Sequence, residues 1–245
     1  MKKLLLALFM IFPLFVGACS CDKFDITTYE SAVKNYSKST GIEYRLKVTV
    51  KEEGASKYLR EESSNKYILT TDGNVQEYAS ELKKFDIPVD SKGVEGNPSL
   101  KSTLNRYYVG ETGKFYTKIK EGTSAPITAV EVRSYDDLYQ DTNDKNNVKN
   151  LVPLFSKDQI SEFKISKLEG SKGYSEATFI APVPSHIECS EKSTQYTVVM
   201  NKSFQFSSIT FSVVNETVVT TYEYTFYNFN SDVNIEFPTD LASYS

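Results

Sequence analysis

The alternation of apolar and polar positions predicts a chain built mainly from β-strands. The clearest case is 42–51, where Ile42, Tyr44, Leu46, Val48 and Val50 alternate with polar residues. This period of two is typical of a strand with one buried face in an antiparallel sheet. Further strands are predicted at 57–64, 66–71, 105–109, 114–119, 128–133, 160–168, 173–180, 194–200, 204–214, 217–229 and 233–237. Residues 74–84 fit either a strand or a short helix.

Short turn sequences separate these strands. Asp72-Gly73 is a strong hairpin signal, and Gly110–Gly113, Asn201-Lys202 and Asn215-Glu216 have turn-forming compositions. Residues 86–102 are rich in Pro, Gly and Ser and are predicted to be a connection. Many short strands with tight turns favour one large antiparallel sheet or a sandwich.

A helix is predicted at 27–40, before the first strand. Tyr29, Ala32, Val33 and Tyr36 are spaced i, i+3, i+4 and i+7, which gives one apolar stripe. Thr27 and Glu30 fit a capping box at the start of this helix, and Gly41 is expected to end it. A second, short helix is predicted near 148–155, after the acidic, Asn-rich residues 136–150. Both helices are expected to cover one face of the sheet.

The N-terminus predicts export and a lipid anchor. Two lysines precede an apolar run from Leu4 to Val16, which is shorter than the roughly 20 residues that span a bilayer. Val16-Gly17-Ala18-Cys19 then resembles the lipobox of bacterial lipoproteins, whose cysteine carries a thioether-linked diacylglycerol. Two acyl chains anchor a protein stably. The alternatives are an ordinary signal peptide cut after Ala18 and an uncleaved anchor.

These features divide the chain into three parts. Residues 1–18 are predicted to be a lipoprotein signal peptide, 19–26 a lipidated tether, and 27–245 a single β-rich ectodomain. The predicted location is the extracytoplasmic face of the cell membrane, with the acyl anchor on Cys19 as the membrane contact. Cys21 and Cys189 are the other cysteines; they form either a disulfide or a free thiol and a buried apolar side chain.

Composition and motifs do not indicate enzymatic chemistry. The chain has 28 basic and 32 acidic residues without a basic cluster, which argues against a nucleic-acid partner. His186 and Cys189 are three residues apart, but a zinc site needs two further ligands. The acidic residues Asp136, Asp137, Asp141 and Asp144 do not fit an EF-hand, and a looser calcium contact is the alternative to a solvated loop. No phosphate loop or nucleophile elbow is present. We therefore expect no enzyme, cofactor or metal.

The C-terminal sequence carries a family resemblance. "YEYTFYNFNSDVNIEFPTD", from Tyr222 to Asp240, reads as a long strand, an Asn-containing break and a short strand. It resembles the terminal strands of bacterial lipoproteins of the LolA and LppX group. The resemblance implies an α+β, predominantly β fold. Its core would be a curved antiparallel sheet, or half-barrel, with an N-terminal helix and one short helix packed on it around an apolar cavity.

The aromatic residues near the C-terminus are the candidate ligand site. Strand periodicity puts Tyr222, Tyr224 and Phe226 on one face and Tyr227 and Phe229 on the other. A bulge is predicted near Ser207-Ser208, because the apolar positions change parity there. Leu46, Val48 and Val50 are expected to line the same cavity as Tyr222, Tyr224 and Phe226. The function predicted is a monomeric lipoprotein that binds a lipid or other apolar ligand. The alternative is a structural or interaction lipoprotein with a solid core and no small ligand.

Overall fold

The computed structural model describes residues 25–132, 152–170 and 173–245. Cys19, Cys21, the acidic loop and residues 148–151 lie outside these ranges. The described chain forms one sheet of eleven antiparallel strands and one α-helix, α1 (Ile26–Ser37). The strands are β1 (Gly41–Glu52), β2 (Lys57–Leu69), β3 (Val75–Pro88), β4 (Ser99–Val109), β5 (Lys114–Glu121), β6 (Ile127–Val132), β7 (Ser161–Lys167), β8 (Ser175–Pro182), β9 (Ser193–Met200), β10 (Phe206–Asn215) and β11 (Val218–Phe229).

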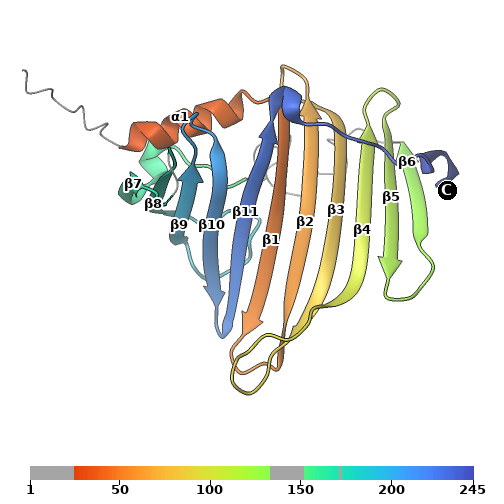
Figure 1. Ribbon diagram of the computed structural model, residues 1–245, viewed down its shortest axis with the longest axis horizontal. Helices are drawn as coiled ribbons and strands as arrows, with labels where there is room; N and C mark the ends of the chain where they lie inside the picture. The colour runs from red at the N-terminus through yellow and green to blue at the C-terminus, as the bar shows by residue number, and fades with distance from the viewer. Residues whose placement is uncertain (1–24, 133–151, 171–172) are drawn as a thin grey trace, which may run out of the picture.

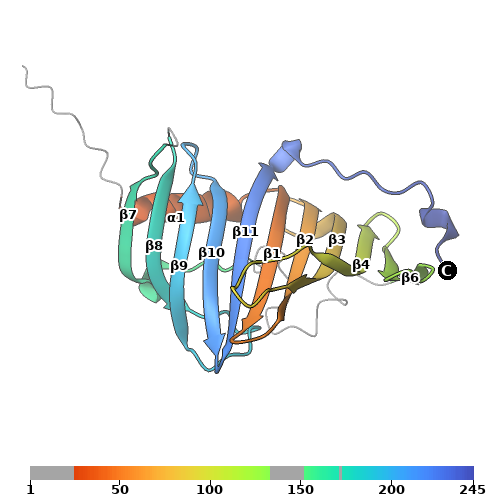
Figure 2. The same cartoon turned by 60° about the horizontal axis from the view of Figure 1, so that its bottom comes forward.

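The sheet consists of two meanders joined in the middle. Its strand order is β6-β5-β4-β3-β2-β1-β11-β10-β9-β8-β7, so the first and last strands pair with each other. β6 and β7 are the two edges, and the sheet is curved without closing (Figures 1 and 2). The predicted fold class, a predominantly β half-barrel with an N-terminal helix, is confirmed.

Helix α1 covers the C-terminal meander, and in Figure 2 it lies behind β7–β11. The predicted apolar stripe is confirmed, because Tyr29, Ala32 and Tyr36 are all buried. The predicted cap was wrong. Asp25 is the N-cap, and its carboxylate accepts the Thr27 backbone N–H at 2.8 Å and the Thr27 hydroxyl at 2.5 Å. An aspartate two residues ahead of Thr27 is thus the acceptor for the first helical amides.

Gly41 has a different role from the predicted one. The helix ends at Ser37, and Gly41 is the first residue of β1. A Cβ atom at this position would overlap the carbonyl oxygen of Asn230 and lie 3.1 Å from the Cβ of Val233. A glycine is therefore required here because the chain after β11 passes directly over the start of β1.

Several predicted elements have different bounds. The segments 57–64 and 66–71 form a single strand, β2, and residues 74–84 belong to strand β3 rather than a helix. The predicted connection at 86–102 is shorter, since β3 continues to Pro88 and β4 begins at Ser99. In the region of the predicted second helix, the described residues 152–155 are irregular and a 3₁₀ turn follows at Lys157–Gln159.

The C-terminal segment crosses the outer face of the sheet, which we define as the face opposite α1 (Figure 1). Residues 233–237 are not a strand, contrary to prediction, although Val233 and Ile235 are buried. The Phe237 ring lies 6.4 Å from that of Tyr107 on β4. The Tyr244 ring lies 6.1 Å from that of Tyr116 on β5. Residues 233–237 thus form an extended apolar segment, which we call the strap, in place of the predicted strand.

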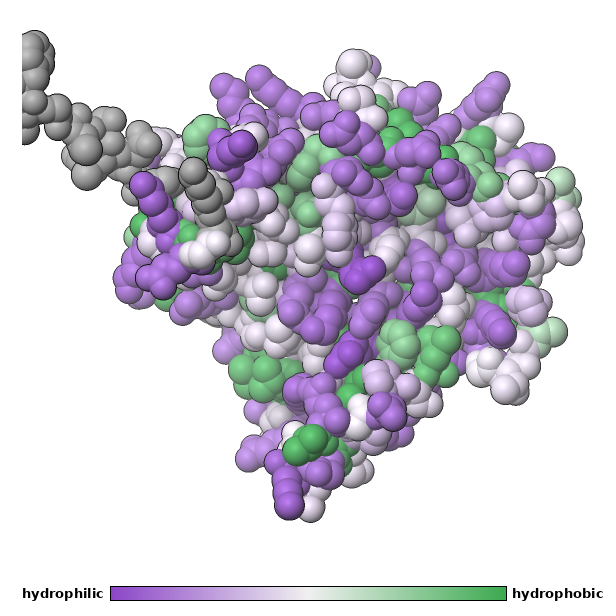
Figure 3. Space-filling view, in the orientation of Figure 1, coloured by the Kyte–Doolittle hydropathy of each residue, from purple (hydrophilic) through white to green (hydrophobic). Residues whose placement is uncertain are grey.

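Elsewhere the outer face is hydrophilic. The side visible in Figure 3 is dominated by hydrophilic residues. Ion pairs join neighbouring outer positions, with 2.7 Å between Lys47 Nζ and Glu223 Oε2 and 2.7 Å between Lys83 Nζ and Glu81 Oε2. These pairs are well exposed and add little stability. The apolar core therefore lies on the inner face, which is the face that contacts α1.

Candidate functional site

One row of apolar side chains crosses the inner face of the entire sheet. Residues that face each other in the strand register share a face and lie side by side. The pairing places ten apolar residues and one serine in a single row across the eleven strands. From β6 to β7 this central row is Ile127, Ile119, Leu104, Leu82, Ser63, Leu46, Tyr224, Ile209, Val198, Ala177 and Ile165.

The part of the central row that lies in the C-terminal meander is densely covered. Tyr224, Ile209, Val198 and Ala177 are all at most 3% exposed. Beside them an aromatic ladder crosses β11 to β8, with ring centroids 4.7 Å apart for Phe211 and Tyr222, 4.8 Å for Tyr196 and Phe211 and 5.6 Å for Phe179 and Tyr196. Spacings of this order are those of packed aromatic pairs. This half of the inner face is a solid core beneath α1.

The part in the N-terminal meander is progressively more exposed. Leu46, Leu82 and Leu104 are half-buried. Ile119 is 38% exposed and Ile127 is 71% exposed. These residues form an apolar strip, which we define as Leu46, Leu82, Leu104, Ile119 and Ile127. Its chemistry suits an apolar ligand, because each of these side chains keeps surface that burial against hydrocarbon would remove from water.

Polar rows lie on either side of the apolar strip. The row toward the α1 end of the strands contains Asn65, Ser80, Arg106 and Thr117, which face one another across β2 to β5. The row on the other side contains Glu61 and Lys84, whose Oε1 and Nζ atoms are 2.6 Å apart. A strip of hydrocarbon between hydroxyl, amide and charged groups matches the layout of ligand sites, where a few polar groups orient an apolar molecule.

The six residues predicted to bind ligand lie close together. All are on the inner face of β1 and β11, with Leu46 opposite Tyr224, Val48 opposite Tyr222, and Phe226 opposite Tyr44. Tyr224 and Phe226 are buried in the packed aromatic core, and burial raises the pKa of Tyr224 well above its ordinary value. Leu46, Val48, Val50 and Tyr222 are half-buried beside the apolar strip. Their role in binding stays a prediction.

Phe229 lies on a different face from the one predicted. The register between β1 and β11 shifts between Glu43 and Tyr44, so that Ile42 faces Phe229 while Tyr44 faces Phe226. This irregularity brings Phe229 onto the inner face, where its ring lies 5.9 Å from that of Phe226. Tyr227 points the other way and is 53% exposed. The predicted bulge near Ser207-Ser208 is confirmed by a register shift between Phe206 and Ser208.

Sequence reasoning missed most of the apolar strip. Leu82 belongs to a segment whose strand and helix patterns could not be separated, and Leu104 lies at the edge of a predicted connection. Arg106 and Tyr108 continue the alternation from Leu104, and this period of two was the available signal. What the sequence lacked was the register that aligns Leu82, Leu104 and Leu46.

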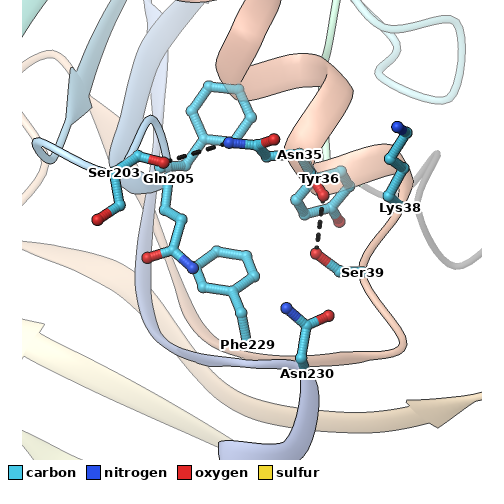
Figure 4. Close-up of a pocket in the computed structure, with 9 residues that line it drawn as sticks. Asn35, Tyr36, Lys38, Ser39, Ser203, Gln205, Phe229 and Asn230 are labelled. Carbon is cyan, nitrogen blue, oxygen red and sulfur yellow. Dashed lines mark hydrogen bonds between the residues drawn. The ribbon is translucent and has the colours of Figure 1, made fainter.

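A small pocket lies at the end of α1 (Figure 4). It has a volume of about 200 Å³. Asn35 Nδ2 donates to the Ser203 and Phe204 carbonyl oxygens at 3.2 and 3.0 Å, and Asn230 Oδ1 accepts the Thr40 N–H at 3.0 Å. These bonds join α1 to the β9–β10 turn, and the α1–β1 connection to the end of β11. The pocket is lined by Asn35, Tyr36, Lys38, Ser39, Ser203, Gln205, Phe206, Phe229 and Asn230.

The metal and nucleophile candidates have ordinary surroundings. His186 is exposed, and the Cys189 thiol lies 3.3 Å from the carbonyl oxygen of Glu191. Among the described residues, no group of three or more His, Cys, Asp or Glu side chains is placed to hold a metal ion. Asp136, Asp137, Asp141 and Asp144 lie outside the described ranges, as does Cys21. Within those ranges no helix is both long and apolar enough to cross a membrane.

Comparison with known proteins gives matches only at the level of structure. No protein-family profile matches the sequence, and no curated protein matches it. The lipoprotein LppX of Mycobacterium tuberculosis is similar in structure, with 10% identity, a TM-score of 0.45, and 86% of this chain and 97% of that chain covered. LprF from Mycobacterium bovis has 9% identity, a TM-score of 0.47 and coverages of 86% and 95%. A DUF1329 family protein from Desulfovibrio piger has 10% identity, a TM-score of 0.30 and coverages of 86% and 94%.

Proposed function

We propose that this protein is a lipid-anchored lipoprotein of the extracytoplasmic membrane face that holds a lipid or other apolar ligand on its inner sheet face. The observation that carries the proposal is the half-exposed apolar strip in the N-terminal meander. In the C-terminal meander the same central row is buried under α1. A ligand lying along the strip would bury Leu46, Leu82 and Leu104, as Val198 and Ile209 are buried in the C-terminal meander.

The strip has the dimensions of a hydrocarbon chain. Adjacent strands are about 4.8 Å apart. Leu104 on β4 is three strands away from Leu46 on β1, which corresponds to about 14 Å. Each methylene group buried there would contribute about 0.8 kcal/mol. The half-buried Val48, Val50 and Tyr222 would extend the contact along β1 and β11.

The proposed membrane anchor would bring the apolar strip close to a source of lipid ligands. Asp25, the N-cap of α1, is six positions after Cys19 in the chain. Fully extended, six residues span at most about 22 Å. A diacylglycerol on Cys19 would therefore keep the domain within reach of membrane lipids.

The alternative function is a structural or interaction lipoprotein without a ligand. The packed aromatic ladder of the C-terminal meander favours it for that half of the sheet, because a core at this density leaves no room for a guest molecule. We therefore place the ligand on the N-terminal meander and its border with β11 at Tyr222, and not among the packed aromatics of β8–β10.

Native mass spectrometry of protein purified from its host tests the proposed ligand. We expect a copurifying apolar molecule, and we expect replacement of Leu82 or Leu104 by Asp to remove it. Both side chains are half-buried, so circular dichroism of each variant must first show an unchanged fold. The absence of any bound molecule, together with the failure of a solvatochromic dye to find a site, would favour the scaffold function instead.

Metabolic labelling with a fatty acid tests the proposed anchor. The wild-type protein should incorporate label and fractionate with membranes, whereas Cys19→Ala should do neither. Cys21→Ala is the matched control, because it removes the neighbouring thiol and keeps Cys19. Label retained in Cys19→Ala would show that the anchor is elsewhere.

A further inference from the structure

A half-buried arginine lies on the inner face next to the apolar strip. Arg106 on β4 is two residues from Leu104, so both side chains are on the same face. Within residues 25–132, 152–170 and 173–245, Arg106 has no hydrogen bond or ion pair, and its burial is intermediate. A partly desolvated guanidinium without an acid is unfavourable, because part of its hydration is lost and nothing replaces it.

The positions around Arg106 are neutral. Its cross-strand neighbours are Ser80 on β3 and Thr117 on β5. On the same strand it is flanked on the inner face by Leu104 and Tyr108. Ser80 is already engaged, because its hydroxyl oxygen accepts a hydrogen bond from the Tyr78 hydroxyl at 2.6 Å. Hydroxyl groups are therefore within one strand spacing on both sides, and none of these four neighbouring sheet positions holds an acid.

Two inner-face acids of this meander, Glu61 and Asp86, are paired with lysines. Glu61 pairs with Lys84 at 2.6 Å. Asp86 pairs with Lys57 at 3.2 Å and Lys101 at 3.3 Å. The Lys57 and Lys101 pairs hold the pKa of the Asp86 carboxyl below its ordinary value, so this group stays charged and engaged. Arg106 is thus left as a positive charge that borders hydrocarbon.

We infer that the ligand of the apolar strip is an anionic amphiphile whose carboxylate or phosphate headgroup pairs with Arg106. Arginine presents a planar fork of donors that matches both groups with two parallel hydrogen bonds. The hydrocarbon chain would lie from Leu104 across Leu82 to Leu46, and the hydroxyls of Ser80 and Thr117 would flank the headgroup. This inference rests on the proposed function and adds the class of ligand to it.

Photo-crosslinking to the full-length chain in membrane vesicles tests the headgroup. Three photoreactive probes share one alkyl chain and differ only in the head: a fatty acid, an alkyl phosphate and a neutral alcohol. Labelling is measured against probe concentration for the wild type, Arg106→Gln and Arg106→Lys. Arg45→Gln is the matched control, because Arg45 is an exposed arginine on the outer face of β1.

The wild type should be half-labelled at a lower concentration of an anionic probe than of the alcohol. Arg106→Gln should raise that concentration about ten- to a hundredfold for the anionic probe and leave the alcohol unchanged, as expected for loss of a charge-assisted bond. Arg106→Lys should recover part of the affinity, and Arg45→Gln should change nothing. Preference for the acid over the phosphate, or the reverse, identifies the headgroup.

Two results would overturn the inference in distinguishable ways. Equal labelling by all three probes, unaffected by Arg106→Gln, would show a purely apolar site and leave the proposed function standing. No saturable labelling by any probe would overturn the inference and the proposed function together. Peptide mapping of the crosslink adds a check, because attachment outside β1–β5 would show that the alkyl chain of the probe binds at another site.

Discussion

We expect the same substitution, Tyr to Phe, to have opposite effects on stability at two positions of α1. Tyr29 and Tyr36 are seven residues apart on the buried stripe and are 1% and 2% exposed. The Tyr29 hydroxyl oxygen accepts the backbone N–H of Phe155 at 3.1 Å. The Tyr36 hydroxyl is buried and has no hydrogen-bond partner among the described residues. We expect Tyr29→Phe to destabilise the fold and Tyr36→Phe to be neutral or stabilising.

The magnitudes follow from the hydrogen bonds. In Tyr29→Phe the amide of Phe155 stays buried without an acceptor, which costs about 1–3 kcal/mol. In Tyr36→Phe a desolvated hydroxyl is removed and the ring contacts with Phe206 and Phe226, at 6.0 Å, are kept. The gain is from 0 to about 2 kcal/mol. For a domain of this size, 1 kcal/mol corresponds to a change in melting temperature of about 2–4 °C.

Urea unfolding of residues 25–245, followed by circular dichroism, measures both effects. An unchanged dependence of the unfolding free energy on urea shows that the variants unfold in the same way as the wild type. Two results would contradict these expectations: a Tyr29→Phe variant as stable as the wild type, or a Tyr36→Phe variant that loses more than about 1 kcal/mol, the order of one hydrogen bond. The second result would mean that the Tyr36 hydroxyl has a partner in solution.

Two further predictions concern the backbone and alkaline pH. Gly41→Ala should destabilise by about 1–3 kcal/mol or more, because its Cβ would overlap the Asn230 carbonyl. Calorimetry checks this, and a variant as stable as the wild type would contradict it. Burial raises the pKa of Tyr29 to about 12 from 10.0. Its protonated form is favoured by folding, so this stability is complete below about pH 10 and declines by about 2–3 kcal/mol as pH rises to about 12. Urea midpoints across this range measure the decline, and an equal decline in Tyr29→Phe would show that another group is responsible.

The local sequence determined the elements with a strict period. The alternation from Ile42 to Val50 predicted β1, and the stripe from Tyr29 to Tyr36 predicted α1. The apolar residues of a buried face recur with the period of the strand or helix that carries them. Asp72-Gly73 likewise predicted its hairpin, where Gly73 has a φ of 86°. These features depend on neighbours a few residues apart, so the chain carries their signal locally.

The tertiary structure decided the features that join distant parts of the chain. The pairing of β1 with β11 brings Leu46 opposite Tyr224, and its irregularity at Glu43 turns Phe229 inward. The extended segment 233–237 has a strand-like sequence but packs as a strap on the outer face, because apolar rings on β4 and β5 accept it there. Alternation predicts that a residue is buried; it does not predict which partner buries it.

The candidate site shows the same division. Leu46, Val48 and Val50 could be selected from the sequence because their own strand is regular. Leu82, Leu104 and Arg106 could not, because the strip exists only when β1 to β4 are aligned in register and α1 covers the other meander. A shift of one residue in any of these strands would turn its side chains to the opposite face. The sequence thus determines which residues are apolar, and the register alone decides that they form one surface.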